Sequence, residues 1–215
     1  CELVANGLNR ETLVFLEVSS FQAQGMENLS PMGVLWTNFE EDHLDHHKDE
    51  EEYFLAKANL VGNAGQGSVW VGRSVSEKAR ELGCVLPVGP EIVDRKLEDA
   101  SFLPEGHFLT SFPQLENLSI AKAFAKSQGI GEDEFNRAIL SYQPEPHRLQ
   151  KIVTIGEATF WNDSKATNAA AAVAACKNFS GNLFWIGGGK SKGEDSGRLS
   201  RLIKPFVQRA YVIGE

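Results

Sequence analysis

A short acidic segment is the first candidate for chemistry in this sequence. Residues 40–47 read EEDHLDHH and follow an apolar run at 33–38 that is typical of a strand. Carboxylate oxygens bind Mg²⁺, and neutral imidazole binds several divalent ions. The segment therefore predicts a site for a divalent cation and the phosphate that it accompanies. The alternative is a solvated helix start, where acids are stabilising without any ligand, and His46 and His47 fit this alternative better.

A second candidate is Glu17, which interrupts the apolar run at 13–18. An unpaired carboxylate is costly to bury inside a strand. It is tolerated at the carboxyl end of a strand, where α/β proteins bind their ligands, and there it could ligate Mg²⁺. Ser19 and Ser20, which follow, could cap the next element or contact a ligand. An edge-strand Glu facing water, followed by an ordinary cap, is the alternative.

Two polar turns later in the chain are candidates for binding an anion. Residues 162–168 read NDSKATN between an expected strand and an expected helix, whose free N–H groups favour a phosphate or carboxylate. Lys165 adds positive charge there, whereas Asp163 or Ser164 could simply cap the helix. The glycine-rich turn at 187–193 resembles a phosphate loop only superficially, because the GxxxxGK[ST] spacing is absent.

These candidates must be positioned by elements that alternate between strands and helices. Such alternation favours a mostly parallel α/β sheet. The first part of the chain predicts strands at 13–18, 33–38, 68–71 and 84–88, and helices at 50–63, 74–82, 115–127 and 132–141. The QPEPH stretch at 143–147 is rigid and extended, so a domain boundary is expected there. Beyond it we expect strands at 149–155, 158–162, 183–186 and 210–213, and helices at 167–176 and 196–208.

Composition excludes several classes of protein. The chain has 215 residues with 42% hydrophobic content, which is enough for a substantial core, and a formal charge of −8. That charge argues against nucleic-acid binding. Three widely separated cysteines form no CxxC pair, which favours a reducing compartment. No apolar run is long enough to span a bilayer, so we expect a cytoplasmic protein with neither a membrane nor a nucleic acid as partner.

Taken in order, these strings resemble the Mur ligases. The resemblance rests on LEVSSFQ at 16–22, EDHLD at 41–45, AK at 56–57, PHR at 146–148, NDSKATN at 162–168 and GGGKSKG at 187–193. It covers nearly the whole chain and is weakest between residues 89 and 109. It implies a partial central ATP-binding domain at 1–145, built on a mostly parallel sheet. The first half of a Rossmann-like ligase domain is expected at 146–215.

The resemblance implies an ATP-dependent amide ligase of peptidoglycan synthesis, most similar to the members that add D-glutamate. Its substrates would be UDP-N-acetylmuramoyl-L-alanine and D-glutamate, its cofactors ATP and Mg²⁺, and its form a monomer. ATP would phosphorylate the terminal carboxylate, because a carboxylate is otherwise a poor electrophile. The amine of D-glutamate would then attack the acyl phosphate, while Mg²⁺ and basic side chains offset the phosphate charge.

The metal and muramoyl residues implied by the resemblance lie in the first part of the chain. Glu17 and His43 would be Mg²⁺ ligands. Lys57 matches the lysine that the family carbamylates into a ligand for a second Mg²⁺, although its helical pattern alone predicts only a solvated lysine. Ser19 and Gln22 would face the UDP-muramoyl substrate. His43, Lys57 and the later Lys165 would form the catalytic set.

The nucleotide residues implied by the resemblance are Asn117 near the adenine, Arg148 at the phosphates and Asp163 at the ribose. The family often has a His-Asn string before this asparagine, and residues 112–114 depart from it. The departure weakens the match that predicts a contact between Asn117 and the adenine.

The amino-acid residues implied by the resemblance are Lys165, Thr167 and Lys192, which would hold D-glutamate or the intermediate. Lys190 competes with Lys192 for this role, and Ser191 stands where an Asp is common.

The sequence contains no Walker-type phosphate loop, which the family would place before Cys1. We therefore expect the chain to be a fragment that lacks ligase turnover by itself. Three alternatives stay open. They are another Mur-type amide ligase, a non-catalytic binding module and a metal-dependent phosphohydrolase built on Asp42, His43, Asp45 and His46.

Overall fold

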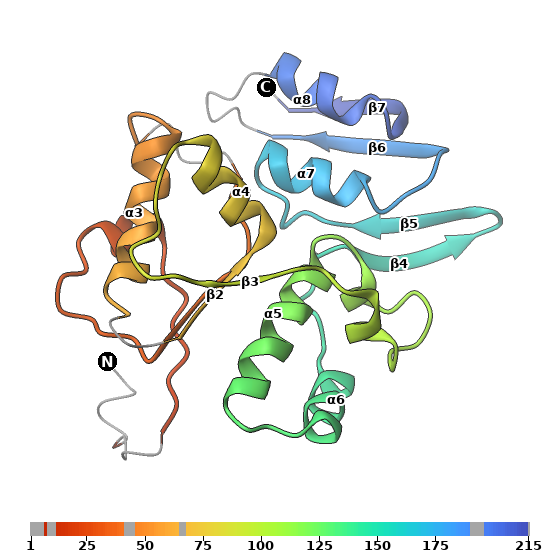
Figure 1. Cartoon of the computed structure of the whole chain (residues 1–215). Coiled ribbons are helices and arrows are strands. Elements are labelled where there is room, and N and C mark those ends of the chain that lie inside the picture. The colour runs from red at the N-terminus through yellow and green to blue at the C-terminus, as the bar shows by residue number, and fades with distance from the viewer. Residues whose placement is uncertain (1–6, 8–11, 41–45, 65–67, 190–195, 215) are drawn as a thin grey trace.

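A three-stranded parallel sheet organises the first part of the chain (Figure 1). The computed structural model describes residues 7, 12–40, 46–64, 68–189 and 196–214. The strands lie side by side in chain order and are β1 (Gly33–Trp36), β2 (Ser68–Gly72) and β3 (Glu91–Val93). Parallel neighbours need a crossover connection. The helices α3 (Glu50–Gly62) and α4 (Arg73–Glu81) lie within these connections.

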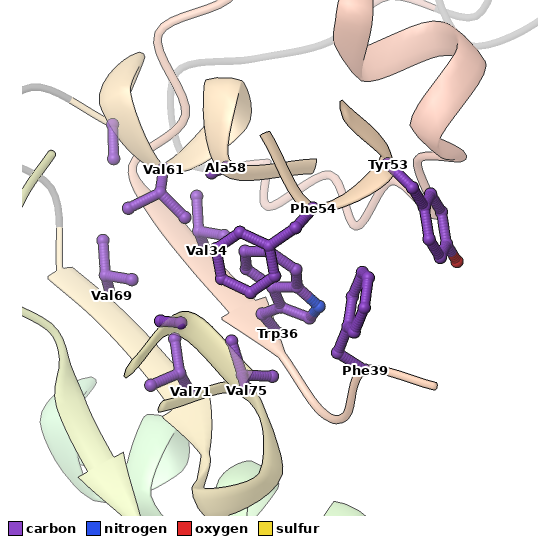
Figure 2. Packing of buried hydrophobic residues seen from close by; sticks show 12 residues of the cluster. Val34, Trp36, Phe39, Tyr53, Phe54, Ala58, Val61, Val69, Val71 and Val75 are labelled. Atoms are coloured by element: carbon purple, nitrogen blue, oxygen red, sulfur yellow. The ribbon is translucent and has the colours of Figure 1, made fainter. Parts of the chain in front are cut away.

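The first core lies between this sheet and the helices that follow β1 and β2. Aromatic side chains of this core pack against one another (Figure 2). The ring centroids of Trp36 and Phe54 lie 4.9 Å apart, and those of Phe39 and Tyr53 lie 4.8 Å apart. Asp49 fixes the start of α3, because its side chain accepts a hydrogen bond from the backbone N–H of Glu52 at 2.9 Å. Three acids in the first turn of α3 suit the positive end of the helix dipole. The buried residues Phe54, Ala58 and Val61 of this helix pack in the core with residues of the sheet.

A second core joins the helices that precede the proline-rich stretch. It contains buried apolar residues of α5 (Gln114–Ser127) and α6 (Glu132–Ser141), and of two short 3₁₀ helices at Leu97–Ala100 and Phe108–Thr110. Leu115 and Leu118 of α5 are almost fully buried there.

The last part of the chain forms two small sheets with helices beside them (Figure 1). Strands β4 (Gln150–Ile155) and β5 (Ala158–Asn162) form an antiparallel hairpin, as predicted, with Gly156 in the left-handed region at φ 60°. Strands β6 (Leu183–Gly188) and β7 (Val207–Ile213) are parallel. The helices of this part are α7 (Ala169–Cys176) and α8 (Ser196–Ile203).

Two strand predictions are wrong. Residues 13–18 are irregular, and all but the half-buried Val18 are exposed, with Phe15 72% exposed. They pair with no strand among the described residues. Residues 84–88 alternate between half-buried and exposed positions as a strand would, but they form none. Pro87 lies in the middle of this run and has no backbone N–H to donate to a ladder. The strand forms three residues later as β3, in a stretch predicted to be irregular.

The other elements match the predictions with shifted ends, so the predicted α/β class with a mostly parallel sheet is confirmed. The largest shift is at α8, which ends at Ile203 so that β7 begins at Val207. Among the described residues, no helix has the length and apolar character needed to cross a membrane.

Candidate functional site

A cavity of about 730 Å³ brings Glu17 and Lys57 to the same place. Its walls come from the irregular segment 13–18, from β1 and the residues around it, from α3, from Phe124 of α5 and from Asn168. Glu17 and Lys57 are forty positions apart in the sequence, yet both line this space. His43 lies outside the described residues, so its pairing with Glu17 stays a prediction.

The ammonium group of Lys57 is held against an aromatic face. Its Nζ lies 5.4 Å from the centroid of the Tyr53 ring, one turn earlier on α3. Tyr53 is 6% exposed and packs on Phe39, so its ring has little freedom to move away. A cation over an aromatic face is favourable, more so when partly shielded from water. Lys57 is accordingly half-buried rather than fully solvated, which the helical pattern alone did not indicate.

The cavity offers oxygen donors of the kind that Mg²⁺ prefers. Glu17 and Glu40 contribute carboxylates and Asn38 contributes an amide oxygen. Within the described ranges, three or more His, Cys, Asp or Glu side chains nowhere gather closely enough to hold a metal ion. The donor set still fits Mg²⁺, which keeps several waters and uses one or two protein carboxylates. Sequence reasoning missed Asn38 as a possible ligand, whereas Glu40 opens the acidic segment 40–47 in which a cation site is predicted.

Ser19 and Gln22 are locked to each other at the start of α2 (Ser20–Gln24). The Gln22 backbone N–H donates to Ser19 Oγ at 3.3 Å, and the Ser19 backbone N–H donates to Gln22 Oε1 at 3.0 Å. This reciprocal pair is a capping box. The helix-cap interpretation of Ser19 is therefore confirmed, while the substrate contact stays a prediction.

A second group of predicted site residues gathers around Glu145. Its carboxylate accepts a hydrogen bond from Lys165 Nζ and lies 3.8 Å from the guanidinium of Arg148. The hydrogen bond from Lys165, the charge of that ammonium and the charge of Arg148 together lower the pKa of Glu145. Lys165 and Arg148 thus already hold one carboxylate between them.

Asp163 is half-buried beside this group. Its Oδ1 accepts a hydrogen bond from the backbone N–H of Leu149 at 2.7 Å. Burial nevertheless raises the pKa of Asp163, because loss of hydration outweighs the Leu149 bond and the charge of Arg148. The predicted capping role of Asp163 or Ser164 is wrong, since α7 is capped by Asn168, whose Oδ1 accepts from the Ala171 N–H at 2.8 Å.

The loop at 163–168 connects the two groups of residues. Asp163 and Lys165 lie at its Arg148 end, whereas Asn168 reaches the cavity that Glu17 and Lys57 line. Thr167 is exposed next to Asn168. Lys190 and Lys192 lie outside the described residues, and the choice between them stays open.

Asn117 lies in the first turn of α5, and only one of its two polar side-chain atoms has a hydrogen-bond partner. Its Nδ2 donates to Gln114 Oε1 at 3.2 Å, while its buried Oδ1 has no hydrogen-bond partner. A buried acceptor without a partner is costly. This orphaned oxygen fits a ligand that donates a hydrogen bond, such as the amino group of a nucleobase.

Sequence reasoning missed a contact between the two parts of the chain. The Phe112 N–H donates to Asn178 Oδ1 at 2.7 Å, and Asn178 Nδ2 donates to the Phe112 carbonyl at 2.9 Å. Lys177 Nζ lies 5.0 Å from the centroid of the Phe112 ring. A backbone held by a side chain 66 positions away leaves no signal in the sequence pattern.

Comparison with known proteins gives consistent relatives. The Mur ligase middle domain family matches residues 2–81. A UDP-N-acetylmuramoylalanine–D-glutamate ligase of Fervidobacterium nodosum is 32% identical, covering 99% of this chain and 49% of the relative. Ligases with the same name from Leuconostoc mesenteroides and Shouchella clausii are 31% and 29% identical, with 97% and 99% of this chain covered, and 49% and 50% of the relatives.

The chain thus spans about half the length of the curated relatives it matches. Its fold also resembles that of a solved structure. The crystal structure of MurF from Acinetobacter baumannii aligns with a TM-score of 0.62 at 16% identity, covering 91% of this chain and 49% of that chain. From the middle-domain match and the relatives aligned over nearly all of its residues, this chain belongs to the Mur ligase family.

Proposed function

We propose that this chain supplies metal, nucleotide and amino-acid contacts to an ATP-dependent ligase that joins D-glutamate to UDP-N-acetylmuramoyl-L-alanine. The observation that carries the proposal is the cavity lined by Glu17, Lys57 and Asn168, in a chain about 30% identical to ligases of that name. The carboxylate, the lysine and the end of the polar loop come from three separate segments. Their meeting in one cavity is what a site for phosphate, cation and amine requires.

The reaction needs a better electrophile than a carboxylate. A carboxylate oxygen of the muramoyl substrate attacks the γ-phosphorus of ATP, and ADP leaves. The D-glutamate nitrogen then attacks the acyl carbon, loses a proton, and inorganic phosphate departs from the tetrahedral intermediate. Most of the catalytic work is positioning and charge stabilisation.

The residues of this chain divide that work between them. In the proposal, Asn117 Oδ1 accepts a hydrogen bond from the adenine, Asp163 holds the ribose and Arg148 binds the phosphates. Lys165, Thr167 and Lys192 hold D-glutamate or the tetrahedral intermediate. The carboxylate that Lys165 and Arg148 share in Glu145 supports an anion-binding role for both. Ser19 and Gln22, fixed by their mutual hydrogen bonds, present a rigid edge to the muramoyl substrate.

Mg²⁺ ions, when bound, neutralise phosphate charge and polarise the phosphoryl group that is transferred. Glu17 and His43 would hold one ion, and Lys57, as a carbamate, would help to hold the second. Carbamylation requires the amine of Lys57 to leave the Tyr53 ring as a neutral nucleophile and to add to CO₂, with loss of a proton. The position of Lys57, in the same cavity as the carboxylates of Glu17 and Glu40, supports this proposal.

The test uses the complete gene product that contains these 215 residues. It is incubated with ATP, Mg²⁺, UDP-N-acetylmuramoyl-L-alanine and D-glutamate, and the amide product and phosphate are measured together. We expect one phosphate for each amide formed, and neither without the amino acid. A better product yield with D-alanine, L-glutamate or L-lysine would instead indicate another amide ligase. Phosphate release from simple phosphomonoesters, with no amide formed, would indicate a phosphohydrolase.

A further inference from the structure

We propose that His47 is a positioning residue, which holds the Ser19 end of α2 against α3 and so keeps the muramoyl-facing pair in register with Lys57. This inference rests on the proposed function, because it assigns a task to the residues placed there. Nothing in the sequence pattern required it, since the pair His46–His47 fitted a solvated helix start. The structure distinguishes the two histidines by burial, with His47 1% exposed and His46 exposed, although their ring centroids lie 4.9 Å apart.

The polar contact of His47 is buried on both sides. Its Nε2 lies 3.0 Å from Ser20 Oγ, and the Ser20 residue is also 1% exposed. The tautomer of the ring decides which of the two atoms donates the hydrogen bond. Because water cannot replace a partner in this buried place, loss of either group leaves the other unsatisfied. The contact therefore fixes the first residue of α2, directly next to Ser19.

The ring of His47 also connects the two helices by packing. Its centroid lies 5.7 Å from that of Phe21 on α2 and 5.2 Å from that of Tyr53 on α3. The Tyr53 ring in turn carries the ammonium of Lys57. A continuous series of contacts thus runs from Ser20 through His47 and Tyr53 to Lys57. A shift of His47 would be felt at both the capping box and the lysine.

The opposite end of α2 has its own attachment to α3. Asn59 Nδ2 donates to the carbonyl of Ala23 at 2.7 Å and to that of Met26 at 3.2 Å. The helix α2 is only five residues long, so each end depends on its own anchor. Removing the His47 anchor should consequently loosen the Ser19 end while the Asn59 end stays attached.

The experiment compares His47→Phe, His47→Gln and the matched control His46→Phe in the complete gene product. His47→Phe keeps a ring but removes the hydrogen bond, whereas His47→Gln restores a polar partner for Ser20. We expect His47→Phe to raise the KM for UDP-N-acetylmuramoyl-L-alanine about tenfold, the effect of one lost buried hydrogen bond. The KM for ATP should stay within about twofold. His47→Gln should recover most of the loss, and His46→Phe should match the wild type.

A merely structural role predicts a different pattern. In that case His47→Phe lowers stability while both KM values stay unchanged, or it raises both equally without recovery in His47→Gln, and either result overturns the proposal. If His47→Phe does not fold, Ser20→Ala removes the same hydrogen bond from the other side and should reproduce the selective rise in KM.

A wild type that forms no amide would overturn the proposed ligase function, and hydrogen exchange would then decide on His47. We expect the amides of residues 20–24 to exchange faster in His47→Phe than in His46→Phe. Equal exchange in the two variants would remove the positioning role, whatever reaction the protein catalyses.

Discussion

Among single residues, the carbamate proposed at Lys57 would compete with the contact between its ammonium group and the Tyr53 ring. The Tyr53 ring favours the ammonium form, whereas a carbamate ligand requires the neutral amine. We predict that Lys57→Ala in the complete gene product lowers ligase turnover by about 10- to 100-fold, as loss of a metal-site group typically does. Millimolar acetate or formate should restore part of it by replacing the lost carboxylate. Lys48→Ala, which alters an exposed lysine just before α3, is the matched control. Unchanged turnover in Lys57→Ala would exclude Lys57 from the site.

Asp163 offers a test in which stability and activity move in opposite directions. Burial raises the pKa of its carboxyl, so the folded state binds the proton more tightly than the unfolded chain. The ionised form therefore lowers stability, progressively as pH rises from the ordinary aspartate value of 3.8 through the raised pKa. Asp163→Asn keeps an acceptor for the Leu149 N–H and removes the charge. We expect a higher Tm than the wild type at pH 7, and a smaller difference near pH 3.

In the same variant, ligase activity should fall if Asp163 holds the ribose, and the KM for ATP should rise. Thermal unfolding followed over a pH series, together with ATP titration of the activity, checks both parts. A lower Tm for Asp163→Asn at pH 7 would contradict the burial argument.

Residue types near the site could be predicted from the sequence, but their partners could not. Glu17 stood out by its place in an apolar run, whereas Lys57 was identified only by the family resemblance, and the structure brings both to one cavity. The cap of α7 was predicted five or four positions too early, at Asp163 or Ser164. The Asp163 side chain is engaged by Leu149, and its carbonyl accepts the Ala166 N–H at 2.8 Å, so the chain turns once more before Asn168 caps the helix. Such competition between partners depends on contacts that no local pattern contains.

At the scale of elements, periodicity predicted most helices well and two strands badly. Helices α3, α5 and α6 begin and end within one residue of the predicted bounds. The two strand errors have different causes, because a strand needs backbone N–H groups to donate and a neighbouring strand to accept, as well as a pattern. Residues 84–88 have the alternating pattern but contain Pro87, and residues 13–18 have no strand beside them in the described part of the chain. Phe15 instead packs edge-on against Phe124 of α5, with centroids 5.8 Å apart.

The junction of β2 and α4 depends on a glycine for a steric reason. A Cβ built on Gly72 would lie 2.0 Å from the carbonyl oxygen of Thr37, in the chain that follows β1. Gly72→Ala should therefore force the ends of β1 and β2 apart and destabilise the protein by about 1–3 kcal/mol. Gly89→Ala is the matched control, since its Cβ would meet nothing within 4 Å. Denaturant midpoints measure the difference, and equal midpoints for the two variants would contradict the close approach.

In the whole molecule, the residues that line the candidate site come from two parts of the chain. The cavity takes Glu17 and Lys57 from the first part and Asn168 from the second. The 215 residues contain no GxxxxGK[ST] string, the loop whose backbone N–H groups hold nucleotide phosphates in the proteins that have it. We predict that these residues, expressed alone, form no amide from the substrates that the complete gene product uses. Mass spectrometry of the reaction mixture tests this, and turnover by the 215 residues alone would show that another segment binds the phosphates.

The paired hydrogen bonds of Asn178 to the Phe112 backbone connect the two parts of the chain directly. The Asn178 amide is itself oriented by the Ala174 carbonyl of α7 at 3.0 Å, so it is presented to Phe112 in a fixed direction. Because both bonds are partly shielded, their loss should cost about 1–3 kcal/mol of the preference for this placement. We predict that Asn178→Ala widens the distribution of distances between the parts without unfolding either core.

Spin labels at Glu134 of α6 and Glu157 of the β4–β5 turn measure that distribution, with Cys1 and Cys84 replaced by serine. Asn178→Asp keeps the acceptor for the Phe112 N–H and loses the donor to its carbonyl, so its distribution should be intermediate. Asn28→Ala, at an exposed asparagine, should match the wild type. If Asn178→Ala gives the wild-type distribution, other contacts hold the parts together. The Asn168 wall of the cavity would then be fixed independently of Phe112.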